Sequence, residues 1–166
     1  MSDDEGAHPN EILLEACRTN SLDLLESVLD MGPKYFEINF RDGVGNTPLH
    51  IAARNASIGV LEVLMYYDGI DPNIANRLEG DTPLHKAASY QDPEMALEMA
   101  RILIDGGAKP KIQNKQKQTC IDVAPIDTHS AVRTYLQHAI LASTVDARDV
   151  VQDDDGEDSD PPSDDE

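Results

Sequence analysis

Apolar residues recur along this chain in short blocks with the spacing of a helix face. The blocks at 58–65 and 99–104 place Ile, Val, Leu and Met three and four positions apart, which predicts an amphipathic helix at each. A shorter apolar block precedes each of them, at 49–53 and at 84–88. A further helix is expected over Ser130–Ala142. The pattern therefore predicts pairs of helices, a short one followed by a longer one.

One segment of the sequence is repeated. It reads GNTPLHIAARN at 45–55 and GDTPLHKAASY at 80–90, and a weaker copy, KQTCIDVAPID, begins at Lys117. Upstream, residues 13–32 align with 49–69 but lack the turn and the Thr-Pro opening. Such a period is typical of a chain built from stacked units with atypical ends. We interpret it as four units, degenerate at both ends, at about residues 10–44, 45–79, 80–116 and 117–142.

The repeated segment has a direct physical interpretation. Gly45 suits a turn that requires positive φ. Thr47 can cap a helix that begins at Pro48, where the missing N–H of proline costs no hydrogen bond. Leu49 can point into a core, and the small Ala52 allows a neighbouring helix to approach closely. Each unit is expected to be a turn, a short helix, a loop, a longer helix and an extended return.

The copies differ in informative places. Gly106 and Gly107 are expected to end the longer helix of the second clear unit. An insertion around residues 92–94 is expected to lengthen the loop between its two helices. In the last unit Cys120 stands in the place of the proline and Asp122 in that of the histidine.

The pattern G-x-T-P-L-H-x-A-A followed by an apolar helix resembles the ankyrin repeat over about residues 10–142. The resemblance implies an all-α fold, an α-solenoid of about four stacked helix-turn-helix repeats with hairpin-like loops. It also implies that His50 and His85 are structural, each imidazole bonding to backbone and to a threonine side chain. The motif residues are Thr47, Pro48, Leu49, His50, Thr82, Pro83, Leu84 and His85.

Charge is distributed unevenly along the chain. Its 166 residues suit a single domain, and the formal net charge is −19. Residues 149–166 hold ten acidic residues and no basic one, so we expect a disordered acidic tail over 143–166, and a flexible N-terminus over 1–9. So acidic a chain is not expected to bind nucleic acid or an anionic membrane directly, because both would repel it.

Catalytic and metal chemistry find little support in the sequence. Two cysteines make no disulfide framework, and no signal peptide opens the chain, so a cytoplasmic or nuclear protein is expected. We also expect a monomer. The histidines lack Cys or Glu partners at metal-site spacing. A nucleophilic site of Cys120, Asp127 and His129 is the least favoured hypothesis, since no oxyanion-donor motif accompanies it. We therefore expect neither an enzyme nor a cofactor.

The ankyrin resemblance implies a binding face made of hairpin tips and the exposed positions of the first helices. Leu78 and Tyr90 stand out, because an apolar or aromatic group facing solvent calls for an explanation. Any single one of these positions could equally be only solvated. The predicted partner-binding residues are Arg41, Val44, Asn46, Arg54, Asn55, Arg77, Leu78, Glu79, Asp81, Ser89, Tyr90, Gln113, Lys115, Gln116 and Gln118.

Two hypotheses remain for what this face holds. In the first, an adaptor or chaperone holds a basic protein client through the groove and the acidic tail, a layout that resembles small acidic ankyrin proteins escorting ribosomal proteins. In the second, a regulatory inhibitor or assembly factor grips a folded partner through the groove alone.

Two features of the charged segments bear on regulation. Lys109, Lys111, Lys115 and Lys117 form a basic finger that could either be merely solvated or attract the acidic tail. Ser2 and Ser163 stand in acidic contexts that suit phosphorylation.

Overall fold

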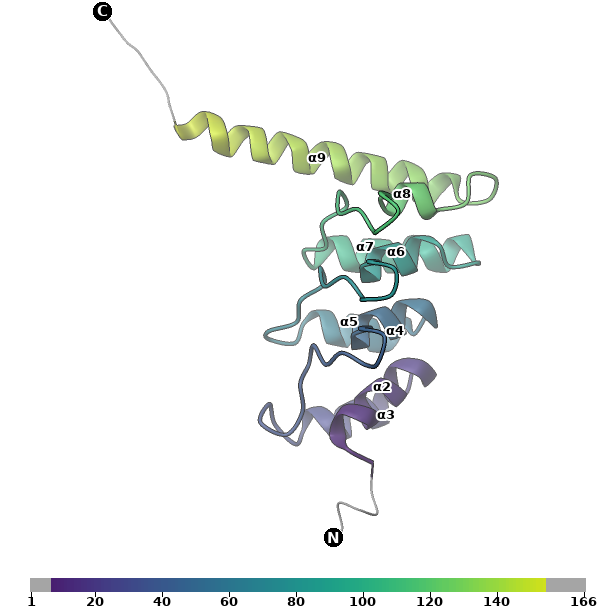
Figure 1. Ribbon diagram of the computed structural model, residues 1–166, viewed down its shortest axis with the longest axis vertical. Coiled ribbons are helices and arrows are strands. Elements are labelled where there is room, and N and C mark those ends of the chain that lie inside the picture. Colours follow the sequence, from purple (N-terminus) through teal and green to yellow (C-terminus); the bar gives the residue numbers. More distant parts are fainter. Residues whose placement is uncertain (1–6, 155–166) are drawn as a thin grey trace, which may run out of the picture.

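The computed structural model of the chain describes residues 7–154, with side chains described for 7–144. Figure 1 shows helix pairs stacked along the long axis, from the first unit at the bottom to the last at the top. No strand occurs among the described residues, and the expected four-unit α-solenoid is confirmed. The pairs are α2 (Pro9–Thr19) with α3 (Leu22–Leu29), α4 (Pro48–Arg54) with α5 (Ile58–Met65), α6 (Pro83–Ala88) with α7 (Pro93–Asp105), and α8 (Cys120–Val123) with α9 (Ser130–Asp154).

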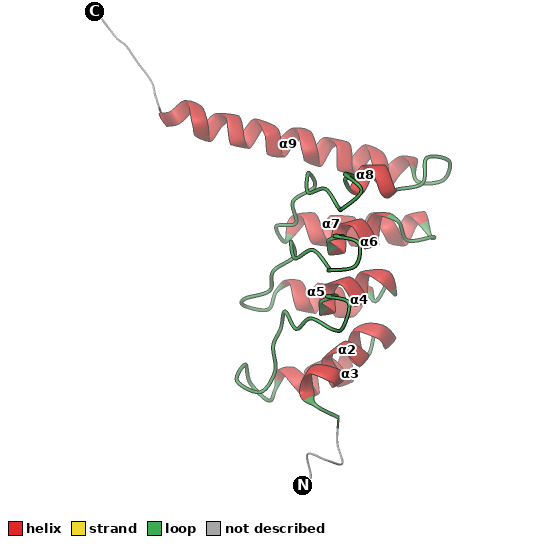
Figure 2. Cartoon of the chain, in the orientation of Figure 1, coloured by secondary structure: helices red, strands yellow, loops and turns green. Residues whose placement is uncertain are grey.

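The helices form two layers. The first helices of the units, α2, α4, α6 and α8, contact one another in succession, and so do the second helices, α3, α5, α7 and α9. The connections between units leave the stack as long loops, drawn green in Figure 2. Each unit therefore buries its apolar side against the units before and after it, as expected of a solenoid.

The short helices begin as their sequence predicts. Thr47 caps α4, Pro48 occupies its first turn, and the imidazole of His50 accepts a hydrogen bond from the Thr47 N–H at 3.0 Å. In the last unit Asp122 takes over the role of the histidine, because its carboxylate accepts from the Thr119 N–H at 2.9 Å. Such reciprocal capping satisfies N–H groups that a helix start leaves free.

An aliphatic core runs through the stack. Leu49 and Leu84, the leucines of the two clear motifs, are 0% and 1% exposed, and the paired alanines that follow them are completely buried. In the second layer Leu64 and Leu103 are also fully buried. Small residues on the first helices let the layers approach closely, so the core needs no large aromatic side chains.

The insertion near residue 92 lengthens mainly a helix: α7 has 13 residues and α5 has 8, whereas the loop 89–92 exceeds 55–57 by one residue. The sequence-based expectation placed the whole insertion in the loop. Asp92 caps α7, its carboxylate accepting from the N–H groups of Glu94 at 2.9 Å and Met95 at 3.4 Å. Pro93 follows at the first helical position, where proline is tolerated. The other end agrees with the prediction, since α7 stops at Asp105 before two glycines.

The last helix is longer than predicted. It was expected to end at Ala142, but α9 continues to Asp154, so the predicted disordered tail over 143–166 overlaps a helical backbone in its first part. Residues 143–154 contain no glycine or proline, and nothing in that stretch stops a helix. Figure 1 shows α9 extending beyond the stack. The remainder of the predicted tail, 155–166, lies outside the described residues, as do residues 1–6 of the predicted flexible N-terminus.

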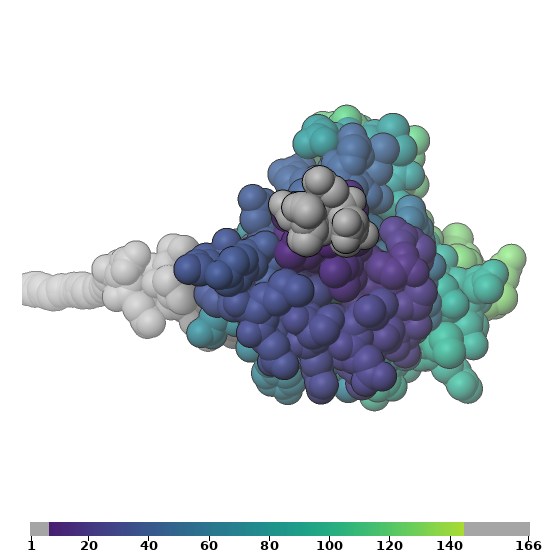
Figure 3. All heavy atoms as spheres, turned by 90° about the horizontal axis from the view of Figure 1, so that it is seen from below, coloured from purple at the N-terminus to yellow at the C-terminus, as the bar shows by residue number. Residues whose placement is uncertain are grey.

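The first unit covers the N-terminal end of the stack, as the view from below in Figure 3 shows. Its long connection to the second unit is held by a few specific contacts. Phe36 is only 5% exposed, and its ring lies 5.8 Å from that of Tyr67. The Glu37 N–H donates to the Asn10 side chain at 2.8 Å. These contacts fix the chain direction before the first clear hairpin.

Candidate protein-binding surface

The three hairpins share one construction. At equivalent places Asp42, Asn76 and Asn114 use a side-chain oxygen to accept two backbone N–H groups from their own turn, at 2.9–3.1 Å. Asx side chains favour turns because they bond to the backbone a few residues ahead. The hairpins therefore have defined shapes.

Close backbone contact joins each hairpin to the next. The Arg77 N–H donates to the Val44 carbonyl at 2.9 Å, and the Lys115 N–H to the Glu79 carbonyl at 3.0 Å. Gly45, with φ +88°, makes the first contact possible, because a Cβ there would lie 2.5 Å from the Arg77 nitrogen. Gly80 has the same role against Lys115. The hairpin tips consequently form one continuous edge.

The repeat histidines are buried and structural, as the ankyrin resemblance implies, and they also connect the units. Because Nδ1 of His50 accepts from the Thr47 N–H, its proton lies on Nε2, which donates to the Asp81 carbonyl in the next unit at 2.7 Å. His85 reaches the Gln118 carbonyl in the same way, at 2.8 Å. Burial lowers the pKa of His50 from 6.5 to about 4, since the charged imidazolium loses its hydration.

His129 is a third linking histidine that the sequence did not reveal. It is 1% exposed, with one ring nitrogen 2.7 Å from the Thr128 hydroxyl and the other 2.6 Å from the Tyr90 carbonyl. It lies outside the repeated motif, so nothing in the sequence pattern pointed to this role. Both ring nitrogens are occupied, which leaves neither for Cys120.

The two cysteines lie in the core. Cys120 is 1% exposed, and its thiol donates to the Pro110 carbonyl at 3.4 Å. Burial raises the pKa of both Cys17 and Cys120 to about 12, which disfavours the thiolate that a nucleophile requires. The structure therefore does not assemble the nucleophilic site considered from the sequence. Nor does any group of three or more metal-ligating side chains occur within the described residues.

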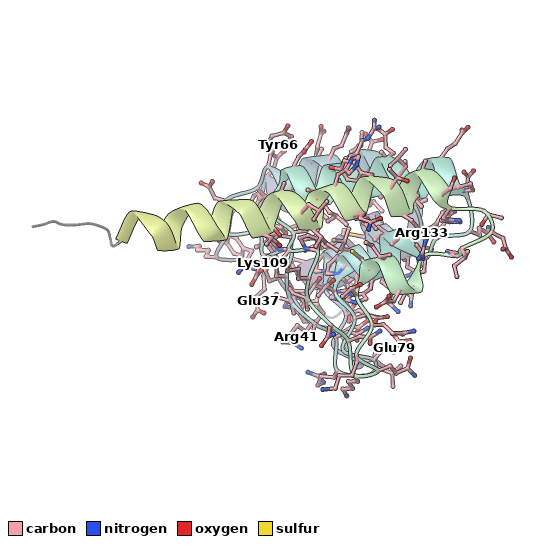
Figure 4. The ribbon with its side chains drawn as sticks, turned by 90° about the horizontal axis from the view of Figure 1, so that it is seen from above. Glu37, Arg41, Tyr66, Glu79, Lys109 and Arg133 are labelled. Atoms are coloured by element: carbon pink, nitrogen blue, oxygen red, sulfur yellow. The ribbon has the colours of Figure 1, made fainter. Side chains whose placement is uncertain are left out.

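The exposed surface of the hairpins is named here the hairpin edge. Its cations are fixed by neighbouring backbone: Arg41 donates to the Ala75 carbonyl at 2.9 Å, and Arg77 reaches back to the carbonyl of Asp42 at 3.1 Å. The ammonium of Lys115 likewise donates to the Arg77 carbonyl. Figure 4 shows the hairpin loops, with Arg41 and Glu79 labelled, on one side of the stack. The hairpin edge consists of Arg41, Val44, Arg77, Leu78, Glu79, Lys115 and Gln116.

A shallow depression lies where α4 and α6 end. Its volume is about 550 Å³. Its lining includes four residues predicted from the repeat pattern and two that were not, Lys86 and Gln91. The repeat alignment could have identified Lys86 as a first-helix residue of this surface. It follows His85 in its motif as Ile51 follows His50 in the preceding one. The lining residues are Arg54, Asn55, Lys86, Ser89, Tyr90 and Gln91.

Lys86 couples the depression to the hairpin edge. Its ammonium lies 2.6 Å from the Glu79 carboxylate and 3.3 Å from that of Asp81. The hydrogen bond from Lys86 lowers the pKa of Glu79. The two predicted acidic contact residues, Glu79 and Asp81, therefore share one ammonium group, which compensates one of their two negative charges.

Several predicted contact residues lie deeper than expected. Asn46 is only 4% exposed and accepts from the Asn76 amide at 2.9 Å, so it links hairpins and cannot contact a partner. Tyr90 is half-buried against the core, as is Gln118 in its hairpin, whereas Gln113 is exposed. Leu78, at 64% exposed, keeps its predicted place. The predicted phosphorylation sites Ser2 and Ser163 lie outside the described residues.

The opposite face differs in character. Tyr66 is 90% exposed, and Figure 4 shows it on the side of the stack away from the hairpins. It borders a hollow with Met65 and Ile102, flanked by the carboxylates of Glu62 and Asp105. This hollow is thus flanked by carboxylates, whereas the exposed tips of the hairpins carry the cations Arg41, Arg77 and Lys115. Across residues 7–154 no helix combines the length and apolar content needed to cross a bilayer.

Comparison with known proteins agrees with this architecture. A family model for ankyrin repeats in three copies matches residues 2–76, and one for a single ankyrin repeat matches residues 79–115. The chain is 31% identical over 134 residues to the putative ankyrin repeat protein FPV031 of fowlpox virus, covering 80% of this chain and 37% of that protein. It is 40% identical over 83 residues to protein phosphatase 1 regulatory subunit 12A of the mouse, covering 50% of this chain and 8% of that protein.

The most extensive of these similarities covers most of both chains. The ankyrin repeat-containing protein YGL242C of Saccharomyces cerevisiae is 40% identical over 149 residues, which span 83% of this chain and 81% of that protein. Stacked units, capped Thr-Pro helices and linking histidines occur where the repeat pattern requires them. The chain belongs to the ankyrin repeat family, whose repeats are protein-protein interaction modules.

Proposed function

We propose that this protein is a non-catalytic adaptor or chaperone-like holder of a protein client. The observation that carries the proposal is the continuous exposed surface formed by the hairpin edge and the adjoining depression. It combines an exposed apolar residue, Leu78, with several rigidly held cations. Such a mixture suits recognition of another protein, where an apolar anchor and a polar rim act together.

The client is proposed to carry a basic segment, as a ribosomal or nucleic-acid-binding protein does. Because the hairpin edge is itself cationic, the basic segment would lie on the acidic residues 149–166, and the rest of the client on the edge. Complementary charge of this kind speeds encounter and keeps the client soluble. The two free, buried cysteines fit a reducing compartment, and we propose that the protein lies in the cytoplasm or nucleus. We further propose that it is a monomer.

A second candidate function is a regulatory inhibitor or assembly factor that binds a folded partner through the groove alone. The depression favours it, because Arg54, Asn55 and Ser89 offer directional hydrogen bonds without any need for the acidic residues. The two functions differ in their dependence on salt, since exposed charges separated by solvent are screened at high ionic strength.

Affinity purification at two salt concentrations tests the proposal. Three full-length forms are compared: wild type, a form whose acidic residues in 149–166 are changed to Asn or Gln, and Leu78→Ser. Under the proposal, client recovery falls steeply between 50 and 500 mM NaCl and is reduced in both variants. Recovery that survives salt and charge removal but not Leu78→Ser would favour the groove-only function. Client recovery that is unaffected by high salt, by removal of the acidic charges and by Leu78→Ser would refute both proposed functions.

A further inference from the structure

The cations of the hairpin edge lack acidic partners. Within the described residues the ion pairs are Arg18 with Glu15 and Lys86 with Glu79 and Asp81. Neither Arg41, Arg77 nor Lys115 lies within ion-pair distance of a described carboxylate, and all three are exposed. In a chain with a net charge of −19, three exposed cations without an ion-pair partner are unexpected.

These cations also form an ordered row. Each comes from a different hairpin, and each is held by a carbonyl of the neighbouring hairpin: Arg41 by Ala75, Arg77 by Asp42 and Lys115 by Arg77. Packed helices lie about 8–10 Å apart, so one cation per unit gives a row with roughly that repeat. Fixed side chains lose less conformational freedom when they bind a ligand.

Nearby acidic groups reduce the positive charge of the row but do not cancel it. Glu79 and Asp81 pair with Lys86 and not with a cation of the row. The Asp42 carboxylate accepts N–H groups of its own turn and keeps its negative charge, but it lies beyond ion-pair distance of the row. The last hairpin, 109–119, contains four lysines and no acidic residue. They do not form one compact finger, because the backbone of Lys109 bonds to Asn73, whereas Lys115 reaches Arg77 at the tip.

We propose that the hairpin edge binds an acidic peptide segment and that its occupant is residues 155–166 of this chain. That segment contains seven acidic residues and no basic one, which complements the row. A chain of twelve residues can span roughly 40 Å when extended, whereas the overhang of α9 from 143 to 154 is roughly 18 Å long. The segment is therefore long enough to turn back past the overhang.

The spacing of charges in the segment also fits. Pro161 and Pro162 favour an extended polyproline-type conformation, in which every third residue recurs at about 9 Å. Glu157 and Asp160 have this spacing. Carboxylates three residues apart can therefore meet successive cations of the row. Because the segment is tethered, its effective concentration at the edge is in the millimolar range, which compensates for weak individual contacts.

Amide NMR spectra of the full chain test the contact in the absence of any client. Wild type is compared with a form whose seven acidic residues in 155–166 are changed to Asn or Gln. At 20 mM NaCl the amide signals around Arg41, Arg77 and Lys115 should differ between the two forms, while those around Glu62 on the opposite face coincide. The differences should shrink at 500 mM NaCl. Coincident hairpin signals at low salt would overturn the proposal.

A spin label identifies the occupant directly. The label is attached to Ser163→Cys, where Cys17 and Cys120 stay unreactive because both are buried. Hairpin signals should broaden, and broadening should be lost on changing Arg77 and Lys115 to Gln but kept in the matched control Lys34→Gln. In a mixture of spin-labelled protein with unlabelled protein, broadening of the hairpin signals of the unlabelled molecules would instead show that the segment contacts a second copy. No broadening at all would refute the surface. Since no client is present, failure here leaves the proposed function untouched.

Discussion

The pH dependence of stability should expose the histidine link between the second and third units. His50 accepts a hydrogen bond from Thr47 with one nitrogen and donates to Asp81 of the next unit with the other. Protonating Nδ1 would point an N–H at the Thr47 N–H, so the buried site favours the neutral ring. The perturbation is therefore acidification from pH 7 to pH 5, compared between wild type and His50→Gln.

The sign and size follow from the depressed pKa of His50. Between pH 6.5 and pH 4 the unfolded chain binds a proton that the folded chain excludes, so stability is complete above pH 6.5 and is lost as the pH falls. A pKa lowered from 6.5 to about 4 corresponds to about 3 kcal/mol in full. About 2 kcal/mol of this should disappear between pH 7 and pH 5.

Urea unfolding followed by circular dichroism measures the effect. At pH 7, His50→Gln should lower the free energy of unfolding by about 1–3 kcal/mol, because the buried groups of Thr47 and Asp81 lose a partner. At pH 5 the gap between wild type and variant should narrow by about 2 kcal/mol, since only the wild type loses the histidine contribution. Carboxylates titrate in both proteins and cancel. A gap that is the same at pH 7 and pH 5 would refute the reasoning.

Three further predictions concern packing and chemistry. Gly45→Ala should destabilise the fold by about 1–3 kcal/mol, because the new Cβ meets the Arg77 nitrogen at 2.5 Å and φ is +88°, whereas Gly43→Ala, with open space around it, should have little effect in the same urea titration. Leu103→Ala should cost about 2–5 kcal/mol by leaving a cavity between the second helices, and calorimetry would show a lower melting temperature. Cys120 should react with a thiol reagent at pH 7 only as fast as the chain opens, because burial raises its pKa to about 12; rapid labelling of the folded protein would contradict this.

Local features were predictable from the sequence. Thr47 as a cap, Pro48 at the first helical position and Gly45 at positive φ follow from the chemistry of single residues and their near neighbours. The period of the repeat then predicted that each unit packs against the next. The start of α7 was missed because Asp92 and Pro93 look like a loop until the cap geometry is known.

Contacts between units were less predictable, because they join residues about a repeat apart. Asn46 looks like an exposed hairpin residue, but Asn76 from the next unit covers it. His129 looks like a possible base for Cys120 until the Tyr90 carbonyl is found beside it. That Arg77 has no described carboxylate within ion-pair distance likewise depends on the positions of side chains on three hairpins.

Site-specific photocrosslinking in cells tests most directly the central claim that the hairpin side holds another protein. A photoreactive amino acid is placed at Leu78 on the hairpin edge, and in a matched control at Glu98, which is exposed on α7. We predict a discrete crosslinked protein with a basic segment at Leu78 and only background at Glu98. Equal crosslinking at both positions, or crosslinking at Glu98 alone, would contradict the account.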